Sequence, residues 1–593
     1  MKYPVLQPLA QYNEVQDVFL GLNANLKTDP REWADMSNLS PRDFPMFAPR
    51  EPRGTVDTLT SPAGIMERDT LVHVDGDTLY INGIAVTGLV LLTGESYVPK
   101  QLVSLGAYII IMPDKMYVNT ADLTDYGHID STFSFAGDVV LTPARVDGTD
   151  MDMDTVSVGT VPPVDPDNGD YWIDTTDIPH TLRQYSVMSE VWVEIASTYT
   201  KIAMTGIGSY FSEDDGVEIA GLTFSGSDPV LEAEIDALNG NKVLAVVADD
   251  YIIVQGIMSQ VYTIVGANVT VDRAMPDMDY LTESENRLWG CKYGFVDGVT
   301  VNQLYACALG DFKNWTRYAG ISTDSYAASV GTDGVFTGAI TYLGYPVFFK
   351  EGCLHKVYGN IPENYRIETT ECRGVQAGSH KSLAIVNELL LYKGRTDVLA
   401  YDGSLPVGIG EALGTETYRE AVAGVYKSRY YISMKDSLNA WHLFMYDTAK
   451  RLWFREDATQ AMGFAQVDDD LYYIDVTTGN IVSVYGKTGT AEAAVAFSAT
   501  TGIIGFESKD YKYVSRLIIR GKVASGASLS VYFRYDSAGS WVLAGTVTGA
   551  GIVKSVILPV KPKRCDHFEM KLTGTGDIRV FSIATIREGG GDG

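Results

Sequence analysis

The chain has 593 residues, of which 46% are hydrophobic and 20% are charged, and this excludes a largely disordered protein. The length predicts several domains, because a single hydrophobic core seldom serves more than about 300 residues. The net charge of −29 repels nucleic-acid phosphates and anionic membranes, so a function that needs tight binding to either is not expected.

The cysteines and the apolar runs predict a protein made in a reducing compartment and not inserted in a membrane. The first residues, MKYPVLQPLAQYNEVQ, lack the basic and apolar segments of a signal peptide, and the longest apolar runs have only strand length. No C-x-x-C pair occurs, so we expect buried free thiols rather than disulfides or zinc ligands. The five cysteines are Cys291, Cys307, Cys353, Cys372 and Cys565.

Residues 1–54 predict an extended N-terminal arm. Proline fixes φ and restricts the preceding residue to extended conformations, so a proline-rich segment is not helical over much of its length. We expect a neighbouring subunit to bury the apolar side chains of this arm, which would offset the entropy lost when the arm is ordered. The prolines are Pro4, Pro8, Pro30, Pro41, Pro45 and Pro49, and the apolar side chains are Phe19, Leu20, Trp33 and Phe47.

Residues 55–150 and 275–489 predict the two parts of a β-propeller. Apolar strands alternate there with short turns of Gly, Asp and Asn, as in DTLVHVDGDTLYING from Asp69 and YIIIMPDKMYVN from Tyr108. Repeat units start near residues 60, 101, 284, 340, 380, 424 and 461, and the last five are roughly 37 to 56 residues apart. That spacing matches a four-stranded blade, so the fold class is all-β with a propeller of about seven blades.

Three turns in the chain run from an Asp to a Trp. They are GDFKNW ending at Trp315, DTAKRLW ending at Trp453, and DSAGSW ending at Trp541. We interpret these turns as hairpin closures rather than catalytic devices, and we expect Trp315 and Trp453 to be buried at blade turns.

Residues 151–274 predict an inserted β module. Residues 162–197 form an aromatic β unit, and short strands follow it to Ala274. The strongest helix candidate is residues 228–240. The aromatic unit has two interpretations, a glycan-binding surface that stacks on sugar rings or a small β core. Its aromatic residues are Tyr171, Trp172, Tyr185 and Trp192.

Residues 490–593 predict a C-terminal β-sandwich, because five or more alternating strands follow one another there. No G-x-S-x-G, H-E-x-x-H or G-x-x-x-x-G-K-[ST] motif occurs anywhere in the chain. The acidic turns at 147–154 and 165–170 bunch carboxylates but lack the bidentate Glu of a calcium loop. We therefore expect no catalytic residues, no cofactor and no metal, and a protein that is not an enzyme.

A sialidase-like propeller is the enzyme alternative. Such an enzyme needs three arginines that converge on the substrate carboxylate, together with a Tyr nucleophile and an acid. The spacing of the arginines in this chain does not single out a triad. The candidates are Arg317, Arg373, Arg395, Arg429 and Arg451.

Several segments resemble the propeller proteins of bacteriophage tails. The segments are NRLWGC from Asn286, GDFKNW from Gly310, FFKEGC from Phe348 and RCDHFEMKL from Arg564. The family is that of the tail nozzle or tail hub, which includes the packaged-DNA stabilisation proteins of short-tailed phages. The resemblance covers most of the chain outside 151–274.

The resemblance implies a structural virion protein made in the bacterial host cytoplasm. It implies a homo-oligomeric ring in the tail, commonly a hexamer, that contacts a head-to-tail adaptor or other tail proteins. DNA would pass through this ring during ejection, and an acidic lumen would let the DNA move without gripping it. No catalytic residue is implied.

Two other functions stay open beside the tail protein. One is a carbohydrate-binding or sialidase-like propeller that acts on host surface glycans. The other is a different propeller scaffold, such as a cell-surface adhesin. The aromatic unit at 162–197 favours the glycan reading, and the missing signal peptide argues against the adhesin.

Overall fold

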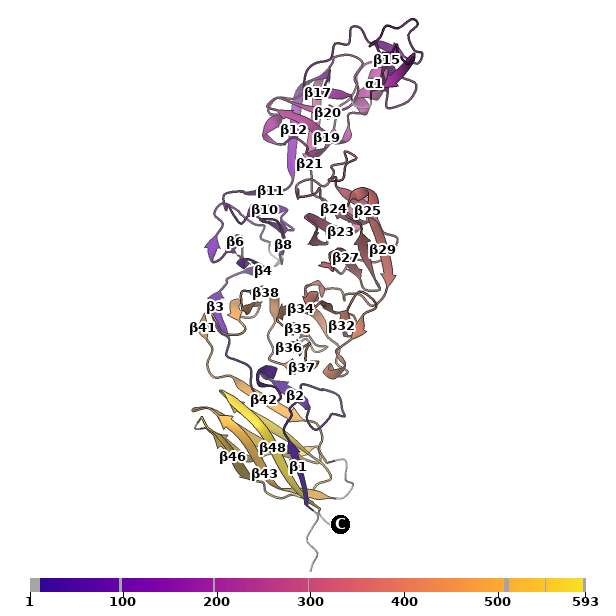
Figure 1. Cartoon of the computed structure of the whole chain (residues 1–593). Coiled ribbons are helices and arrows are strands. Elements are labelled where there is room, and N and C mark those ends of the chain that lie inside the picture. The colour runs from indigo at the N-terminus through magenta and orange to yellow at the C-terminus, as the bar shows by residue number, and fades with distance from the viewer. Residues whose placement is uncertain are drawn as a thin grey trace, which may run out of the picture. The chain divides into compact units, whose positions relative to one another are not determined.

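The computed structural model describes residues 11–94, 99–195, 198–296, 298–505, 511–549 and 551–589. Almost all regular structure in these ranges is β-strand, and α1 (Pro229–Asp236) is their one α-helix (Figure 1). No helix among these residues has the length and hydropathy needed to cross a bilayer. The chain divides into two compact units, residues 1–102, 348–354 and 369–593 in the first and residues 103–347 and 355–368 in the second.

Six four-stranded sheets and a seventh sheet of five strands follow one another along the chain with the repeat of a β-propeller, which confirms the predicted fold class. The first three are β4 (Pro62–Arg68), β5 (Thr70–Asp75), β6 (Thr78–Ile81) and β7 (Ile84–Ala85); β8 (Gln101–Leu105), β9 (Tyr108–Met112), β10 (Met116–Asn119) and β11 (Tyr126–His128); and β22 (Tyr280–Ser284), β23 (Arg287–Val296), β24 (Val299–Ala306) and β25 (Tyr326–Ser329).

The next three are β26 (Gly338–Tyr342), β27 (Tyr345–Lys350), β28 (Cys353–Tyr358) and β29 (Arg366–Glu371); β30 (Ala384–Val386), β31 (Leu389–Lys393), β32 (Val398–Tyr401) and β33 (Val407–Gly408); and β34 (Arg419–Tyr426), β35 (Arg429–Lys435), β36 (Trp441–Asp447) and β37 (Leu452–Arg455). Several hairpins use two-residue turns in which both residues have positive φ, such as Asn387 at 47° and Glu388 at 68°. This backbone matches the right-handed twist of the flanking strands.

The seventh sheet is completed by a strand from the N-terminal region. Its order is β38-β39-β40-β3-β41, and β3 pairs antiparallel with β40. The strands are β38 (Ala461–Val467), β39 (Asp470–Asp475), β40 (Asn480–Ser483), β3 (Gly54–Thr58) and β41 (Thr490–Ala491). The last blade therefore contains strands from both ends of the propeller sequence.

The expected burial of two turn tryptophans is confirmed. Trp315 is 1% exposed and its indole N–H donates to Phe312 O at 2.8 Å, whereas Trp453 is 2% exposed and donates to Ile409 O at 2.7 Å. Each ring thus fills a core while its one polar group is satisfied. Trp541 differs because it is only half-buried.

The insertion is a closed six-stranded barrel that carries a separate small sheet. The barrel begins at Ser131 rather than at Met151, because β12 belongs to it and pairs with β21 along most of its length. The helix α1 lies within the range expected for a helix, with Asp228 as its N-cap. The barrel strands are β12 (Ser131–Ala144), β17 (Tyr199–Ala203), β18 (Gly216–Ala220), β19 (Gly240–Ala248), β20 (Tyr251–Gln255) and β21 (Tyr262–Arg273).

The C-terminal residues form a sandwich of two sheets, as expected, and the N-terminal region supplies one strand to each sheet. The sheet orders are β1-β48-β43-β46 and β2-β42-β47-β44-β45. The strands are β1 (Gln11–Gln16), β2 (Trp33–Ser37), β42 (Ala496–Thr501), β43 (Lys512–Val523), β44 (Ser528–Tyr535), β45 (Ala538–Thr548), β46 (Val553–Pro559), β47 (Phe568–Thr575) and β48 (Ile578–Gly589).

The expectation that a neighbouring subunit buries the N-terminal apolar side chains is wrong, because the same chain buries most of them. Phe19, Trp33 and Phe47 are 3%, 1% and 3% exposed, and Leu20 is half-buried. The ring centroids of Phe47 and the sandwich residue Phe497 are 5.7 Å apart. The segment is thus part of the sandwich core. The burial of its apolar side chains therefore no longer supports assembly into a ring, which stays an untested prediction.

Candidate functional site

A buried polar cluster in the first unit centres on Arg53, just before β3. Its Nη1 donates to Asp457 Oδ2 at 2.7 Å and to Tyr473 Oη at 2.8 Å. Its Nη2 donates to Glu456 Oε2 at 2.5 Å. The two carboxylates directly follow β37 of the sixth blade and the tyrosine lies on β39 of the seventh, so Arg53 ties both blades to the N-terminal segment.

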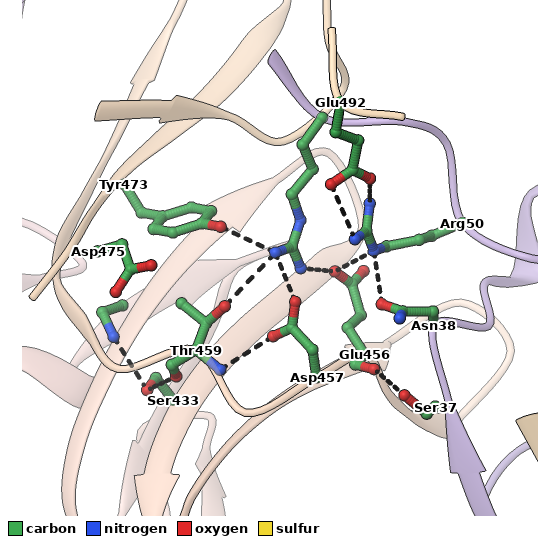
Figure 2. Close-up of polar contacts among 12 residues, drawn as sticks. Ser37, Asn38, Arg50, Ser433, Glu456, Asp457, Thr459, Tyr473, Asp475 and Glu492 are labelled. Carbon is green, nitrogen blue, oxygen red and sulfur yellow. Dashed lines mark hydrogen bonds and ion pairs between the residues drawn. The ribbon is translucent and has the colours of Figure 1, made fainter. Parts of the chain in front are cut away.

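A second arginine extends the cluster toward the sandwich (Figure 2). Arg50 forms an ion pair with Glu492, which follows β41, and its Nε donates to Asn38 Oδ1 at 2.8 Å. The Glu456 carboxylate lies between the two guanidinium groups, 4.0 Å from Arg50 Nε. We name this set the arginine clasp: Arg50, Arg53, Glu456, Asp457 and Glu492.

The arginine clasp is built for stability rather than chemistry. The side chains of Arg53 and Glu456 are 6% and 2% exposed, and both Nη atoms of Arg53 already donate to Asp457, Tyr473 and Glu456. Burial by itself would raise the pKa of Asp457, but the charge of Arg53 and hydrogen bonds from Thr459 hold that pKa below its usual value. Asp457 therefore stays ionised and paired with Arg53.

A different surface lies on the small sheet of the second unit. This sheet comprises β13 (Ser157–Gly159), β14 (Tyr171–Asp174), β15 (Thr181–Ser186) and β16 (Val191–Glu194), and thus coincides with the expected aromatic unit. Directly paired residues of neighbouring strands point to the same side. Trp172 pairs with Arg183 and Tyr185 pairs with Trp192, so these four side chains share one side of the sheet.

The aromatic rings on this side form a continuous group. The ring centroids of Trp172 and Trp192 are 5.6 Å apart, and those of Tyr185 and Trp192 are 5.3 Å apart. Trp172 is buried and donates its indole N–H to Gly159 O at 2.9 Å, whereas Tyr185 and Trp192 remain half-buried. The buried ring thus supports two partly open rings.

Polar groups are placed among these rings. The Arg183 guanidinium lies over the Trp172 ring, 6.0 Å from its centroid, and its Nε donates to Asp174 Oδ2 at 3.2 Å. A hydrogen bond from the Thr176 hydroxyl lowers the pKa of Asp174, with Arg183 adding a smaller effect, so this carboxylate is ionised. We name the set the aromatic face: Trp172, Asp174, Arg183, Tyr185 and Trp192.

The opposite side of the small sheet packs onto the rest of the insertion. Ile173 and Leu182, which alternate with the residues of the aromatic face, are buried together with Ile257. Beside them, His180 Nδ1 lies 3.2 Å from Glu234 Oε1 on α1. Burial raises the pKa of Glu234, although the Ser259 backbone N–H and hydroxyl donate to its Oε2. The aromatic face is therefore the more open side among the described residues, since Tyr185 and Trp192 remain half-buried there.

The arginines considered for a sialidase have separate partners. Arg373 Nη2 donates to Pro406 O at 2.9 Å, Arg429 Nη1 donates to Tyr485 Oη at 3.0 Å, and Arg317 lies 3.6 Å from Asp214. Arg395 and Arg451 are exposed. No set of three arginines around one carboxylate site is formed by these contacts.

The two acidic turns are closed by their own hydrogen bonds. Asp147 Oδ1 accepts from the backbone N–H and hydroxyl of Thr149, and Asp170 Oδ2 accepts from the backbone N–H of Asp167 at 2.8 Å. Within the described residues, no group of three or more His, Cys, Asp or Glu side chains is arranged to hold a metal ion.

Comparison with known proteins finds no matching family model and no match among curated proteins. Solved structures that match include an exo-β-1,3-galactanase from Phanerochaete chrysosporium, at 10% identity over 51% of this chain and 94% of that one, with a TM-score of 0.21. A β-fructofuranosidase from Bombyx mori has 8% identity over 53% and 92%, with a TM-score of 0.16.

A third match is the extracellular domain of a hybrid two-component system from B. thetaiotaomicron. It has 9% identity over 94% of this chain and 99% of that one, with a TM-score of 0.23. At these identities and scores the likeness concerns the fold alone, and no activity or residue role is transferred from it.

Two expectations are corrected by these comparisons. The expectation of a structural phage-tail protein is wrong, because the solved structures that match include glycoside hydrolases and the extracellular domain of a two-component system. The expectation that the protein is not an enzyme is contradicted by the same hydrolase neighbours.

Proposed function

We propose that this protein is a carbohydrate-binding β-propeller protein and that the aromatic face is its glycan contact. The observation that carries the proposal is the outward side of the small sheet, where Tyr185 and Trp192 are half-buried around the buried Trp172. Flat aromatic rings provide apolar contact area at a low entropy cost, and polar groups beside them fix the orientation of a ligand. A pyranose ring offers the matching C–H face and hydroxyl rim.

The charges around the aromatic face favour a neutral glycan. Arg183 is already paired with Asp174, and Glu194 lies directly opposite Arg183 on β16. An acidic sugar would meet two carboxylates for one guanidinium, and the chain carries a net charge of −29. Neutral sugars can use the same carboxylates as hydrogen-bond acceptors for their hydroxyls.

The test is retention of the full-length protein on an array of neutral and acidic glycans. We expect binding to neutral glycans, and Trp192→Ala should weaken it about tenfold or more because a stacking surface is lost. Trp541→Ala is the matched control, since Trp541 is also half-buried and lies beside an arginine, with Arg534 Cζ 4.9 Å from its ring centroid. Equal retention of wild type and Trp192→Ala, or no retention of wild type, would sink the proposal.

A further inference from the structure

A cavity of about 250 Å³ opens at one end of the blade formed by β30–β33 in the first unit. Lys393 ends β31 and Asp397 lies just before β32, and the segment from β33 to β34 provides much of the remaining wall. The side chains that give the cavity its chemistry are Arg373, Lys393, Asp397, Glu411, Glu416 and Tyr418.

Lys393 supplies unmet hydrogen-bond donors. The residue is 2% exposed, and among the described residues the only acceptor for its Nζ is Gly394 O at 2.5 Å. Burial lowers the pKa of Lys393 to about 8, with the charge of Asp397 opposing the shift, so the amine is still mostly protonated near neutral pH. An ammonium group has three donors, so two remain for a ligand in the cavity.

Asp397 supplies an unmet acceptor beside this lysine. Its Oδ1 accepts from the Gly410 backbone N–H at 3.0 Å, and its Oδ2 accepts no hydrogen bond from the described residues. Gly408 and Gly410 leave room for this carboxylate, because a Cβ on them would lie 2.0 and 2.3 Å from its oxygens. The placement of Asp397 therefore depends on two positions without side chains.

The mixed charge of the cavity limits its ligand. Two cationic and three carboxylate side chains line it, so an anion would be repelled by the acids and an amine by Lys393 and Arg373. Each hydroxyl of a neutral polyhydroxylated molecule can either donate a hydrogen bond to Asp397 or accept one from Lys393. The volume lies near the lower end of small-ligand sites, which suits one sugar ring rather than a chain.

We propose that this cavity binds one neutral monosaccharide unit, separately from the aromatic face, with Lys393 and Asp397 as its hydrogen-bonding pair. The ligand class rests on the proposed function, but the site does not. Failure of one can therefore be told from failure of the other: variants of the aromatic face test the proposed function, and variants of the cavity test this inference.

The experiment measures binding of D-galactose, D-glucose and L-arabinose to the full-length protein by titration calorimetry, with N-acetylneuraminic acid as the acidic probe. We expect a neutral sugar to bind, and Lys393→Met and Asp397→Asn each to weaken it about tenfold or more. Lys393→Met removes a buried charge at similar length, and Asp397→Asn keeps an acceptor for the Gly410 N–H, so both should fold. Trp541→Ala, outside both sites, should leave monosaccharide binding unchanged.

A second measurement uses the wild-type protein alone. The rate at which an amine-acylating reagent modifies Lys393 is followed by mass spectrometry, and a bound neutral sugar should slow it several-fold relative to exposed lysines. Four results would overturn the inference: no neutral sugar binds, the cavity variants bind as wild type, Trp192→Ala abolishes binding, or the acidic probe binds more tightly. Unprotected Lys393 at saturating sugar would overturn it as well.

Discussion

The arginine clasp and the aromatic face are built from the same three kinds of side chain and do different things. Each has an arginine beside an aromatic ring and a carboxylate: Arg53 with Tyr473 and Asp457, and Arg183 with Trp172 and Asp174. The Arg53 side chain is 6% exposed, whereas the Arg183 side chain is 31% exposed.

The difference lies in what remains unpaired. In the arginine clasp the buried guanidinium contacts two carboxylates and a phenol, and little of this group is left for a ligand. In the aromatic face one carboxylate holds one edge of the guanidinium, and two rings beside it are still partly open. Residue type alone thus does not distinguish a structural joint from a binding surface; burial and unused hydrogen-bonding capacity do.

Replacing the central arginine of the arginine clasp should have the largest effect. Arg53→Met removes the hydrogen-bonded partner of Glu456, which is 2% exposed, and leaves it only Arg50 Nε at 4.0 Å, so the free energy of unfolding should fall by about 3 to 5 kcal/mol. Chemical denaturation followed by tryptophan fluorescence measures this change.

Arg31→Met is the matched control for that experiment. Arg31 pairs with Asp29 on the surface, where their side chains are 52% and 37% exposed, so its loss should change stability far less than the loss of Arg53. Equal effects of the two variants would mean that burial does not set the strength of the arginine clasp.

Acid should weaken the arginine clasp to a smaller extent. The folded-state pKa of Asp457 lies below its ordinary value, so its contribution is present above the unfolded-state pKa and is lost as the pH falls through the folded-state value. Stability measured from neutral pH down to about pH 3 should therefore decline from about pH 4 downward. In Arg53→Met this part of the decline should be reduced, and an unchanged pH profile in that variant would contradict the assignment.

The smallest effect on stability is expected in the aromatic face. Arg183→Met should lower the free energy of unfolding by less than about 1 kcal/mol, since the pair is partly solvated and Asp174 keeps its hydrogen bond from Thr176. Retention on a neutral glycan should nevertheless fall about threefold to tenfold, because a donor at the ligand is lost. A large loss of stability in Arg183→Met with unchanged glycan retention would mean that Arg183 has a structural role, as Arg53 does, and not a role in binding.

The parts of the fold that depend on local pattern were predictable. Alternating apolar residues separated by turns of Gly, Asp and Asn directly indicate hairpins, and the spacing of the hairpins indicates the blade repeat. The burial of Trp315 and Trp453 followed from their place after short turns. The aromatic residues at 171–192 were likewise recognisable as a compact β unit, although their common side became visible only through the strand register.

The parts that depend on distant pairing were not predictable. An extended proline-rich segment has the same sequence pattern whether it packs on its own chain or on another chain. The local sequence of β1 likewise does not indicate that it pairs with β48. The same holds for Arg50 and Arg53, whose partners lie some 400 residues away. The one signal for the arginines was that each directly follows a proline in APREPRG, just before a strand. For the cavity it was a charged KGRTD turn after an apolar strand.

The strand exchange between the two ends of the chain has a consequence for synthesis on the ribosome. The strand β3 has no partner until β40 is synthesised. In the same way, β1 cannot pair before β48 is synthesised, and β2 cannot pair before β42 is synthesised. During most of translation, Phe19, Trp33 and Phe47 therefore lack the sandwich that buries them, while the barrel at 131–273 can already close. Nascent chains stalled after residue 300 should show a protease-resistant barrel and a sensitive N-terminal segment, which is the state that chaperones recognise.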